Sequence, residues 1–497
     1  MKQEFHDVIV VGGGNAGLTA AITAREYVDD VVVVEKAPEP KRGGNSFFTG
    51  GRMRIPHRGL EDLAELSGMD LGELSNIDLD PYTEQDFYAD MQRQTHYRTD
   101  ETLARLVVNG ARDGIRFLRS LGSRFELPLG FDDVNRSGRL KLVGGDDLQH
   151  YEGGPGLVAV LLKACQDRGI AVRYESAGRE LLRGPDGIEG IVVHTPEGPV
   201  EMRARAVVLA CGGYEASPSK RNAYLGAGWD LAKVRGTEFN TGDGLDMAFA
   251  IGARGYGHFG GCHSVAADFF ADDFGDRQYG DVPERVSYHY GITVGSDGKR
   301  YFDEGADMRA YTYARSGRTI VEGTPDSYSV QIFDAKTVDL LRDTYRFFKA
   351  VKCVSDDLRE IAEELNVNAE NLVATVEEYN RSIQPGTIDY TVRDGVSTHG
   401  ITPPKSNWAT PLDTPPYTAF PVAPAITFTF GGLKVDTSAT VLDEGDKAIR
   451  GLYAAGEMVG GIYYHNYPGG SGLVSGTVFG RIAGATAGRR AAQPVPA

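Results

Sequence analysis

The sequence has no long apolar run and few cysteines. No stretch approaches the roughly 18 consecutive apolar residues of a transmembrane helix, so we expect no transmembrane segment. The four cysteines, Cys165, Cys211, Cys262 and Cys353, are widely spaced and show neither metal-ligand spacing nor a paired redox motif. We therefore expect no metal site and buried reduced thiols, which are typical of the cytoplasm.

Basic charge, targeting signals and repeats are also scarce or absent. The 497 residues include 52 Lys and Arg against 69 Asp and Glu, a net charge of −17, so we expect no nucleic-acid partner. The N-terminus is polar and enters an apolar run within a few residues, which predicts no signal peptide and a cytoplasmic location. No internal repeat or low-complexity segment is visible, and the length suits about two or three domains.

Glycine, by contrast, is abundant, and its 64 residues gather in short motifs. An apolar run ends at Gly12-x-Gly14-x-x-Gly17, a helical stretch follows, and a second apolar run ends at Glu35. This is the order of a dinucleotide-binding βαβ unit, in which the glycines allow a tight turn, a close pyrophosphate and close helix packing. The helix N-terminus favours phosphates, and Glu35 can accept hydrogen bonds from a ribose. The motif alone does not separate NAD from FAD.

The regular alternation of strand and helix patterns changes along the chain. It continues to about residue 257, is lost where aromatic and charged residues alternate, and returns near residue 429. The proline-rich tract 402–424 is expected to be an ordered connector. The sequence therefore predicts an α/β fold. A Rossmann-like cofactor domain with a parallel sheet and flanking helices would comprise residues 1–257 and 429–497, and an inserted α+β capping domain residues 258–428.

Further elements accompany the first glycine motif. They are Lys36 directly after the acid, Gly43-Gly44-Asn45-Ser46, Thr241-Gly242-Asp243-Gly244, the tract Asp297 to Glu304, and Gly456-Glu457 before a glycine-rich start of the last helix. This combination resembles the flavoproteins of the fumarate reductase and succinate dehydrogenase superfamily, which also contains 3-ketosteroid Δ1-dehydrogenases. Residues 43–46, 303–305, 412–416 and 426–430 are most similar to tricarballylate dehydrogenases.

The resemblance implies that the cofactor is FAD. Glu35 would hold the adenosine ribose, Glu457 the ribityl or pyrophosphate end, and the start of the last helix the N1 and O2 edge of the flavin, where reduced flavin is negative. The predicted cofactor-binding residues are Gly12, Gly14, Asn15, Ala16, Gly17, Glu35, Lys36, Gly43, Gly44, Asn45, Ser46, Thr49, Gly50, Gly51, Ala177, Gly212, Gly213, Asp243, Gly456, Glu457, Gly472 and Leu473. Gly44 stands where succinate dehydrogenases carry the histidine that links to FAD, so we predict non-covalent FAD.

The resemblance also indicates where a proton is transferred. Fumarate reductases carry a proton-donating arginine shortly after an Arg-Phe-x-x-Glu tract in the capping domain. An ungapped alignment places Met308 at that position, and a one-residue shift places Arg309 there. Tyr311 and Tyr313 follow in the part of the cap where ketosteroid dehydrogenases use a tyrosine base. Arg309, Tyr311 and Tyr313 are therefore three alternative candidates.

Two substrate positions depart from fumarate reductases. Phe428 replaces a carboxylate-binding histidine, and Tyr467 replaces a carboxylate-binding arginine, which weakens the case for a dicarboxylate. Tyr467-Pro468-Gly469 resembles the ketosteroid dehydrogenase element in which a tyrosine hydroxyl and a backbone N–H bind a ketone oxygen. Tyr467 is therefore predicted to polarise the substrate carbonyl. The predicted substrate-binding residues are Arg54, His57, His263, Phe428, Gly470 and Ser471.

The predicted function is an FAD-dependent desaturase that forms a C=C bond α,β to the carbonyl of a small ketone or carboxylate. The substrate would be a cyclic ketone, with or without a carboxylate, or a tricarballylate-like acid, with hydride passing to flavin N5. One alternative is a fumarate-reductase-like reductase of an activated alkene, which would need an external donor because no Cys-x-x-Cys-His haem motif is present. Another is a non-catalytic flavin-binding subunit. Oxygen, a quinone or a carrier protein remain open as the electron acceptor.

Overall fold

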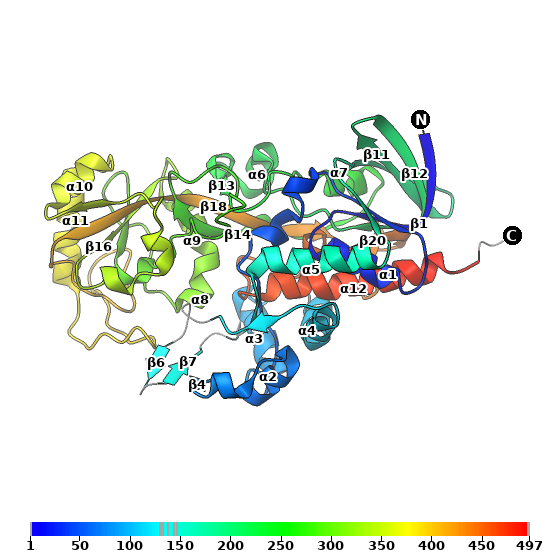
Figure 1. Cartoon of the computed structure of the whole chain (residues 1–497). Coiled ribbons are helices and arrows are strands. Elements are labelled where there is room, and N and C mark those ends of the chain that lie inside the picture. Colours follow the sequence, from blue (N-terminus) through cyan, green and yellow to red (C-terminus); the bar gives the residue numbers. More distant parts are fainter. Residues whose placement is uncertain (1, 129–133, 137–138, 143–144, 146–147, 495–497) are drawn as a thin grey trace. The chain divides into compact units, whose positions relative to one another are not determined.

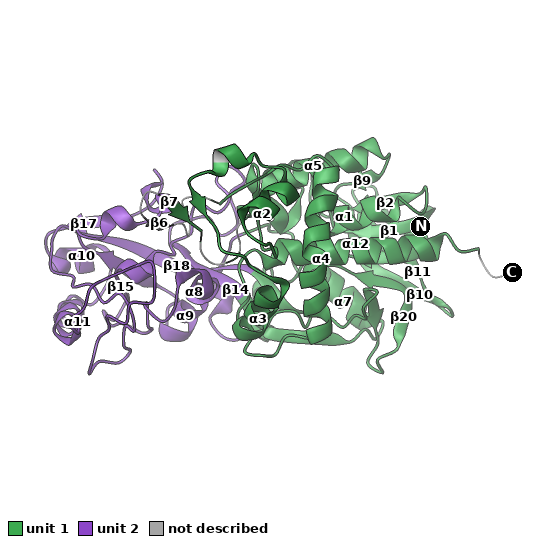
Figure 2. Cartoon of the chain, turned by 90° about the horizontal axis from the view of Figure 1, so that it is seen from below, with its two compact units in different colours: residues 1–225, 236–262, 428–497 green, residues 226–235, 263–427 purple. Residues whose placement is uncertain are grey.

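The computed structural model describes residues 2–128, 134–136, 139–142, 145 and 148–494. The chain forms two compact units (Figure 2). Unit 1 comprises Met1–Leu225, Gly236–Cys262 and Phe428–Ala497, and unit 2 comprises Gly226–Arg235 and His263–Thr427. The assignment of a cofactor role and a capping role to the predicted domains remains a prediction.

The sheet of unit 1 contains the predicted βαβ unit. Its strand order is β10-β11-β12-β1-β2-β9, with β20 on β12 and β19 on β20. β1 is parallel to both β2 and β12, and the four valines of β2 are all buried, as expected of a strand covered on both faces. The strands are β1 (Lys2–Val11), β2 (Val31–Val34), β9 (Ala171–Arg173), β10 (Ala177–Gly184), β11 (Gly187–Thr195), β12 (Gly198–Leu209), β19 (Thr440–Leu442) and β20 (Ala448–Ala454).

Helices cover this sheet. Two of these helices, α3 and α4, precede residue 122, and another begins at Gly153. The helices of unit 1 are α1 (Asn15–Ala24), α2 (Leu60–Ser67), α3 (Glu84–Gln94), α4 (Glu101–Ser120), α5 (Gly153–Asp167), α6 (Pro218–Leu225), α7 (Asp243–Ala250) and α12 (Ser471–Ala491). Short strands complete the unit: β3 (Arg52–Met53), β4 (Ile77–Asp78), β5 (Phe125–Glu126), β6 (Val134–Arg136), β7 (Arg139–Lys141) and β8 (Leu148–His150).

A row of glycines lets α12 pack directly against α1, and the two helices lie side by side in Figure 1. A Cβ at Gly480 would lie 2.6 Å from the carbonyl oxygen of Ala16, and one at Gly484 would lie 2.3 Å from that of Ala20. Backbone atoms cannot move aside cheaply, so the glycines fix the helix separation. The last helix of the chain is thereby held against the first helix of the βαβ unit.

Substitution of Gly484 by alanine is expected to destabilise the protein by about 1–3 kcal/mol, because the new methyl group overpacks the contact with Ala20. Gly114→Ala in α4 is the matched control, since its Cβ would meet the Thr477 side chain at an ordinary 3.4 Å. That control should be neutral or slightly stabilising, because alanine favours a helix over glycine. Thermal unfolding of both variants measures the difference, and equal midpoints would contradict the packing argument.

Unit 2 is built on a six-stranded sheet of order β13-β18-β16-β15, in which β14 and β17 also pair with β18. The predicted helical residues Leu358 and Ile361 lie in α10, Leu372 and Val376 lie in α11, and all four are in the core of the unit. The elements are β13 (Lys233–Val234), β14 (Gly255–Asp268), β15 (Ile292–Gly295), β16 (Ser329–Phe333), β17 (Cys353–Ser355), β18 (Tyr417–Leu433), α8 (Arg309–Thr312), α9 (Ser316–Gly323), α10 (Leu358–Glu364) and α11 (Ala369–Ser382). β14 and β18 continue into unit 1.

The expected connector at 402–424 is partly wrong, because its last part, from Tyr417 onward, is strand. β18 begins at Tyr417 and pairs antiparallel with β16 despite two prolines in the strand, Pro421 and Pro424. The carbonyl of Pro421 still accepts a hydrogen bond from the amide of Phe269 at 3.0 Å. Proline removes only a donor, so acceptor positions of the ladder survive, and proline content alone misled the prediction.

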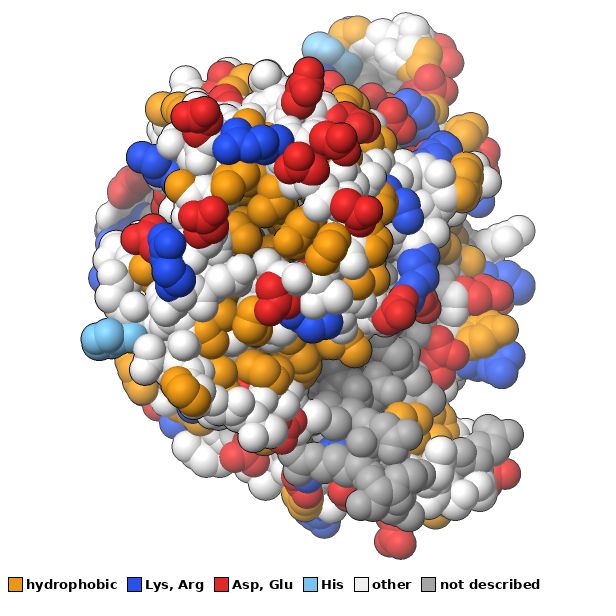
Figure 3. Space-filling model, turned by 90° about the vertical axis from the view of Figure 1, so that its left-hand side faces the viewer, with side chains coloured by type: hydrophobic (Ala, Val, Ile, Leu, Met, Phe, Trp, Pro, Cys, Tyr) orange, Lys and Arg blue, Asp and Glu red, His pale blue; other side chains and the backbone are white. Residues whose placement is uncertain are grey.

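Two further sequence expectations concern thiols and membranes. All four cysteines are free, but Cys211 is only partly buried, whereas Cys165, Cys262 and Cys353 are buried. Within the described ranges, no helix is both long and apolar enough to cross a membrane. The face on the side of α10 and α11 shows hydrophobic side chains gathered around its centre, with charged side chains of both signs among them (Figure 3).

Candidate functional site: a dinucleotide cradle and a tyrosine loop

The turn between β1 and α1 brings backbone segments very close together. Gly12 has a φ of 107°, and a Cβ there would lie 2.4 Å from the carbonyl oxygen of Ala210. A Cβ at Gly17 would lie 1.9 Å from the carbonyl oxygen of Gly12. Gly14 is different, because a Cβ there would meet nothing closer than the Ser46 hydroxyl at 3.5 Å. Packing therefore requires glycine at positions 12 and 17. Gly14 instead leaves room beside the start of α1, where the helix N-terminus favours phosphate.

Glu35 is held beside this turn. Its two carboxylate oxygens accept hydrogen bonds from the amides of Gly13 and Ala37, each at 2.7 Å. Burial raises the pKa of the carboxyl above its usual value, although both backbone hydrogen bonds act in the opposite direction. The two amides fix the orientation of the side chain and leave lone pairs for a ribose hydroxyl.

Lys36 and Asp243 form an ion pair, with Lys36 Nζ 2.9 Å from Asp243 Oδ2. The same ammonium donates to the Thr241 hydroxyl at 2.6 Å, and Arg179 lies 3.1 Å from Asp243. Burial alone would raise the pKa of Asp243, but the hydrogen bond from Lys36 leaves it below the usual value. Both predicted cofactor residues therefore tie the start of α7 to the end of β2.

The Gly-Gly-Asn-Ser element forms a short 3₁₀ helix, Gly44–Phe48, preceded by Gly43. The Ser46 hydroxyl accepts a hydrogen bond from the Asn15 amide at 3.0 Å. Asn45 accepts from the Thr237 amide at 2.8 Å and donates to Glu215 at 2.5 Å. The element thus joins α1 to segments about 170 and 190 residues further along the chain.

The remaining predicted cofactor residues lie at the ends of strands or at tight approaches within unit 1. The Thr49 hydroxyl accepts from the Gly51 amide at 2.9 Å, across Gly50. Ala177 is the first residue of β10. Three glycines are in close contact with other predicted or neighbouring residues: a Cβ at Gly212 would meet Asn240 at 2.3 Å, one at Gly213 would meet Glu457 at 2.1 Å, and one at Gly456 would meet Ala16 at 2.8 Å.

Two buried carboxyl groups lie together at this end of the sheet. Glu457 accepts hydrogen bonds from the amide and hydroxyl of Thr429, at 2.6 and 2.8 Å. Glu215 is fully buried and accepts from Asn45 and from Asn240, the latter at 2.6 Å. Burial raises the pKa of both carboxyls, and the neighbouring Glu457 carboxyl raises that of Glu215 further, to well above its usual range. Burial and the neighbouring carboxyl therefore favour the protonated form of Glu215 more than in an exposed glutamate.

Glu215→Gln is expected to remove part of the pH dependence of stability. Glutamate in the unfolded chain ionises near pH 4.3, whereas the pKa of folded Glu215 is raised well above its usual value, so the native state loses stability as pH rises from about 4.3 to the folded pKa, by up to about 1.4 kcal/mol per pH unit. Glutamine does not ionise, so the variant should gain stability relative to the parent over that interval, and measurements from about pH 5 to pH 9 follow it. Thermal unfolding across this range tests it, with exposed Glu180→Gln as the control. Parallel curves for Glu215→Gln and the parent would contradict the argument.

The predicted start of the last helix is confirmed, with Gly470 preceding it at a φ of 77°. The Ser471 hydroxyl donates to the carbonyl of Pro468 at 2.6 Å. Asn15 of α1 donates to the carbonyl of Leu473 at 2.9 Å, so the first turns of α1 and α12 are joined. A Cβ at Gly472 would meet nothing closer than the Phe428 ring at 3.8 Å, which again leaves room beside a helix start.

Tyr467 lies in an aromatic cluster directly before this helix. Its ring packs edge-on against Phe428 at 5.1 Å and against Tyr463 at 5.5 Å. The Tyr467 amide donates to the Asn466 side chain at 2.9 Å, and Asn466 donates to Gln94 at 2.6 Å. The loop is therefore held by both ring packing and hydrogen bonds.

Arg54 is fully buried and forms hydrogen bonds with the loop that carries Tyr467. Its Nε donates to the carbonyl of Gly469 at 2.7 Å, and its own amide donates to the carbonyl of Gly470 at 3.1 Å. The guanidinium also donates to Tyr82 at 2.8 Å and lies 3.2 Å from Asp90. Asp90 thus balances the charge, and Arg54 links α3 to the turn that carries Tyr467.

The other predicted substrate residues are divided between the units. His57 in unit 1 is buried, and its Nδ1 accepts from the Gly59 amide at 3.3 Å. In unit 2, the His263 ring lies edge-on to Tyr313 at 5.4 Å, and the Arg309 guanidinium lies 5.3 Å from the same ring. Burial, and secondarily Arg235, lowers the pKa of His263 well below its usual value, so this imidazole is neutral. Tyr311 lies in α8 with Arg309.

Sequence reasoning missed several residues that organise the site. They are Tyr82, Asp90, Glu215, Thr237, Asn240 and Thr429. Glu215 carried a usable signal, because it follows the predicted strand-ending Gly212-Gly213 by two residues. Asp90 and Tyr82 carried none, since neither an acidic residue on a polar helix nor a tyrosine just before that helix reveals a buried arginine partner.

The residues present fit a bound dinucleotide. Gly14 and Gly472 leave room beside two helix starts, and Glu35 presents a fixed carboxylate. Residues 7–474 match the family described as FAD binding domain. The chain belongs to this family. It is an FAD-binding flavoprotein oxidoreductase of the group whose members act on carbon–carbon bonds, and the predicted α/β fold, superfamily and cofactor are confirmed.

Named relatives support this placement. The flavoprotein is 28% identical to a probable fumarate reductase of Shewanella frigidimarina, over 98% of this chain and 76% of that protein. It is 26% identical to an NADH:fumarate oxidoreductase of Klebsiella pneumoniae over 98% of this chain, but it spans only 48% of that protein. A 3-oxosteroid 1-dehydrogenase of Mycobacterium tuberculosis is 26% identical, over 97% of this chain and 98% of the relative.

Solved structures agree with the relatives. The open conformation of a flavocytochrome c3 fumarate reductase superposes with a TM-score of 0.73 at 26% identity, covering 98% of the flavoprotein and 79% of that chain. A 3-ketosteroid Δ1-dehydrogenase from Sterolibacterium denitrificans superposes with a TM-score of 0.74 at 21% identity, covering 98% and 100%. The second likeness shows the fold alone.

Acid precipitation of the purified flavoprotein is expected to release its yellow chromophore into the supernatant. The reason is that Gly44 replaces the histidine to which succinate dehydrogenases attach FAD. Absorbance of the two fractions measures the release. Colour that stays with the pellet would contradict non-covalent binding.

Proposed function

We propose that the protein is an FAD-dependent desaturase that introduces a C=C bond α,β to the carbonyl of a small ketone or carboxylate. The candidate substrates are a cyclic ketone, with or without a carboxylate, and a tricarballylate-like acid. The observation that carries the proposal is the Tyr467 loop, in which a buried tyrosine packs edge-on against Phe428 with ring centres 5.1 Å apart. A neutral hydroxyl donor suits a carbonyl oxygen better than a pair of carboxylates.

In this proposal Tyr467 donates a hydrogen bond to the carbonyl oxygen and stabilises the enolate that forms when the α-proton leaves. Arg54 acts as a positioning residue, because its charge is balanced by Asp90 and its donors hold the carbonyls of Gly469 and Gly470. The backbone N–H of Gly470 would then face the substrate oxygen from a fixed loop, whereas the Ser471 amide donates to the carbonyl of Pro468 at 3.2 Å. Preorganised donors of this kind lose little free energy to rearrangement during the reaction.

Removal of the α-proton is proposed for a residue of unit 2. Arg309, Tyr311 and Tyr313 remain three alternatives, and the neutral His263 next to Tyr313 would bind substrate without carrying charge. The contact of the Arg309 guanidinium with the Tyr313 ring favours these two as a pair, since a nearby cation stabilises a phenolate. FAD, when bound, supplies the acceptor for the two electrons and the β-hydrogen. The proposal also requires that one of these residues and Tyr467 act on the same substrate molecule.

Anaerobic mixing of the oxidised, FAD-loaded protein with saturated probes tests the direction of the reaction. Cyclohexanone, 3-oxocyclohexane carboxylate and tricarballylate are suitable probes, and bleaching of the yellow band by any of them supports the desaturase. The matched experiment starts from dithionite-reduced protein and adds fumarate or cyclohexenone. An unchanged flavin spectrum with every probe, in both the oxidised and the reduced protein, would favour a flavin-binding subunit without catalysis and would reject the proposal.

A second candidate is a reductase of an activated alkene. It is favoured by the names of the Shewanella and Klebsiella relatives, which are fumarate reductases. Reoxidation of the reduced protein by an alkene, without bleaching of the oxidised protein by any saturated probe, would select it. The electron partner (oxygen, a quinone or a carrier protein) and a cytoplasmic location remain proposals for either direction.

A further inference from the structure

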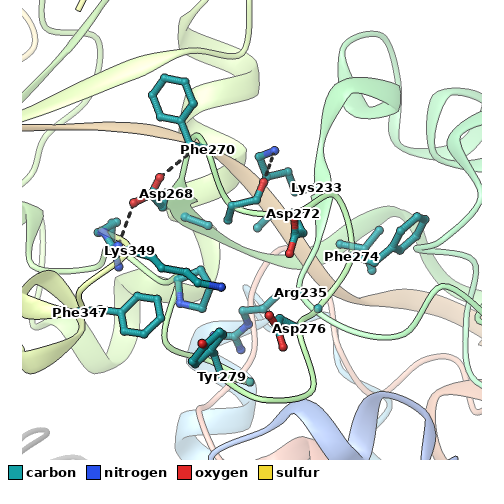
Figure 4. A pocket seen from close by; sticks show the side chains of 18 residues that line it. Lys233, Arg235, Asp268, Phe270, Asp272, Phe274, Asp276, Tyr279, Phe347 and Lys349 are labelled. Carbon is teal, nitrogen blue, oxygen red and sulfur yellow. Dashed lines mark hydrogen bonds and ion pairs between the residues drawn. The ribbon is translucent and has the colours of Figure 1, made fainter. Parts of the chain in front are cut away.

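A cavity of about 140 Å³ lies within unit 2, and none of the residues proposed above for catalysis is part of its lining. Its walls come from β13, the end of β14, the segment 270–285 and residues 347 and 349 (Figure 4). An engineered protein cavity of about 150 Å³ binds benzene, so this space suits one aromatic ring.

Aromatic side chains form much of the lining. Tyr279 and Phe347 meet edge-to-face with ring centres 4.9 Å apart, which presents a preformed aromatic wall. Phe270 and Phe274 also line the space and are 63% and 38% exposed. Large rings left in contact with water at a concave site gain free energy when an apolar ligand covers them.

Most charges of the lining are already paired inside unit 2. Arg285 lies 2.9 Å from Asp268, Arg235 lies 2.9 Å from Glu284, and Lys233 lies 3.4 Å from Asp273. These pairs hold the walls together and leave little net charge for a ligand. Recognition of a charged ligand by this cavity therefore depends on the lining groups that form no such ion pair in the described part of the chain.

Lys349 and Asp272 are those groups. Among the residues that the structure describes, neither forms an ion pair, and the Lys349 ammonium lies 4.4 Å from the centre of the Tyr279 ring. Both side chains extend toward the space bordered by Tyr279 and Phe274 (Figure 4). Asp276 adds a second carboxylate to the lining. A cation and carboxylates thus border one aromatic cavity.

We propose that this cavity binds a single-ring aromatic compound carrying both an ammonium and a carboxylate group. The ring would pack on Tyr279 and Phe347, the ammonium would pair with Asp272, and the carboxylate would pair with Lys349. The inference is independent of the proposed desaturase function, because no residue of the Tyr467 loop or of α8 lines the cavity.

Isothermal titration of the FAD-loaded protein with L-phenylalanine tests the proposal. Saturable one-to-one binding without a change in the flavin spectrum is expected. Phenethylamine and 3-phenylpropionate, which each lack one charge, should bind about three- to five-fold more weakly, as expected from the loss of one partly exposed ion pair. L-Leucine should bind more weakly still, because it lacks the ring.

Charge substitutions then assign the ends of the ligand. Asp272→Asn should weaken the binding of L-phenylalanine and phenethylamine about three- to five-fold and leave that of 3-phenylpropionate unchanged. Lys349→Met should weaken the binding of L-phenylalanine and 3-phenylpropionate by a similar factor and leave that of phenethylamine unchanged. Asp356→Asn and Lys352→Met, at exposed positions outside the cavity lining, are matched controls that should change nothing. No saturable binding of L-phenylalanine up to about 10 mM would overturn the proposal, because that limit corresponds to only about 3 kcal/mol. Binding that perturbs the flavin spectrum, or that ignores both substitutions, would overturn it as well.

Discussion

Tyr467→Phe is expected to lower kcat by about 100- to 1,000-fold while the FAD content stays the same. If the hydroxyl stabilises an enolate in a water-poor site, its loss removes about 2.7–4 kcal/mol from the transition state. The ring itself would remain, because Phe428 and Tyr463 hold it by edge-on contacts that need no hydroxyl. Single-turnover bleaching of the flavin band with a confirmed substrate measures the effect on chemistry alone.

Tyr463→Phe is the matched control for this prediction. Tyr463 belongs to the same aromatic cluster and is also buried, so its substitution removes a hydroxyl from a closely similar environment. Turnover should change by less than about threefold in this variant, because a polar contact outside the reaction contributes mainly to stability. Equal kinetics for Tyr467→Phe and the parent would remove Tyr467 from the mechanism. A rise in KM with unchanged kcat would instead assign it to ground-state binding.

Arg54→Met is expected to destabilise the protein by about 3–5 kcal/mol, because it breaks a buried ion pair and leaves the Asp90 carboxylate with only the more exposed Arg93, 3.3 Å away, as a cation. The same substitution frees the carbonyl of Gly469, so turnover should fall even in the folded fraction. Thermal unfolding reports the first effect. Turnover per bound FAD, measured well below the unfolding temperature, reports the second.

The double variant Arg54→Met/Asp90→Asn separates these two effects. Neutralising Asp90 removes a buried carboxylate that has lost its buried partner, so most of the lost stability should return, whereas the contact with the Gly469 carbonyl stays broken and turnover should stay low. Recovery of both stability and turnover would show that Arg54 is purely a stabilising residue. Loss of substrate binding with unchanged stability in Arg54→Met would show that the arginine binds substrate directly, as the sequence alone had suggested.

The sequence was informative wherever the function of a residue depends on its own backbone or its immediate neighbours. The βαβ unit could be predicted because Gly12 and Gly17 satisfy steric limits inside one strand–helix–strand segment. Glu35 could be placed beside that turn for the same reason, since its amide partners, Gly13 and Ala37, are close in sequence or in the same unit.

Interactions across long sequence separations were not predictable in this way. Nothing in the pattern around Arg54 announces that it would be buried against Asp90 and the carbonyl of Gly469, 415 residues away. Likewise, β18 is a strand only because β16 and β17 supply its ladder partners, which outweigh the prolines that suggested a connector. The pairing of Glu215 with Glu457 also depends on two separate glycine-ended strands meeting at one edge.

The sequence by itself determined that the first segment binds a dinucleotide and how that segment folds, because local steric rules restrict glycine motifs to few backbone forms. Only the tertiary structure decided that Arg54 is paired with Asp90, that Glu215 is buried with a raised pKa, and that unit 2 carries an aromatic cavity. Burial and charge compensation depend on which distant segments pack together, and that packing is a property of the whole folded chain.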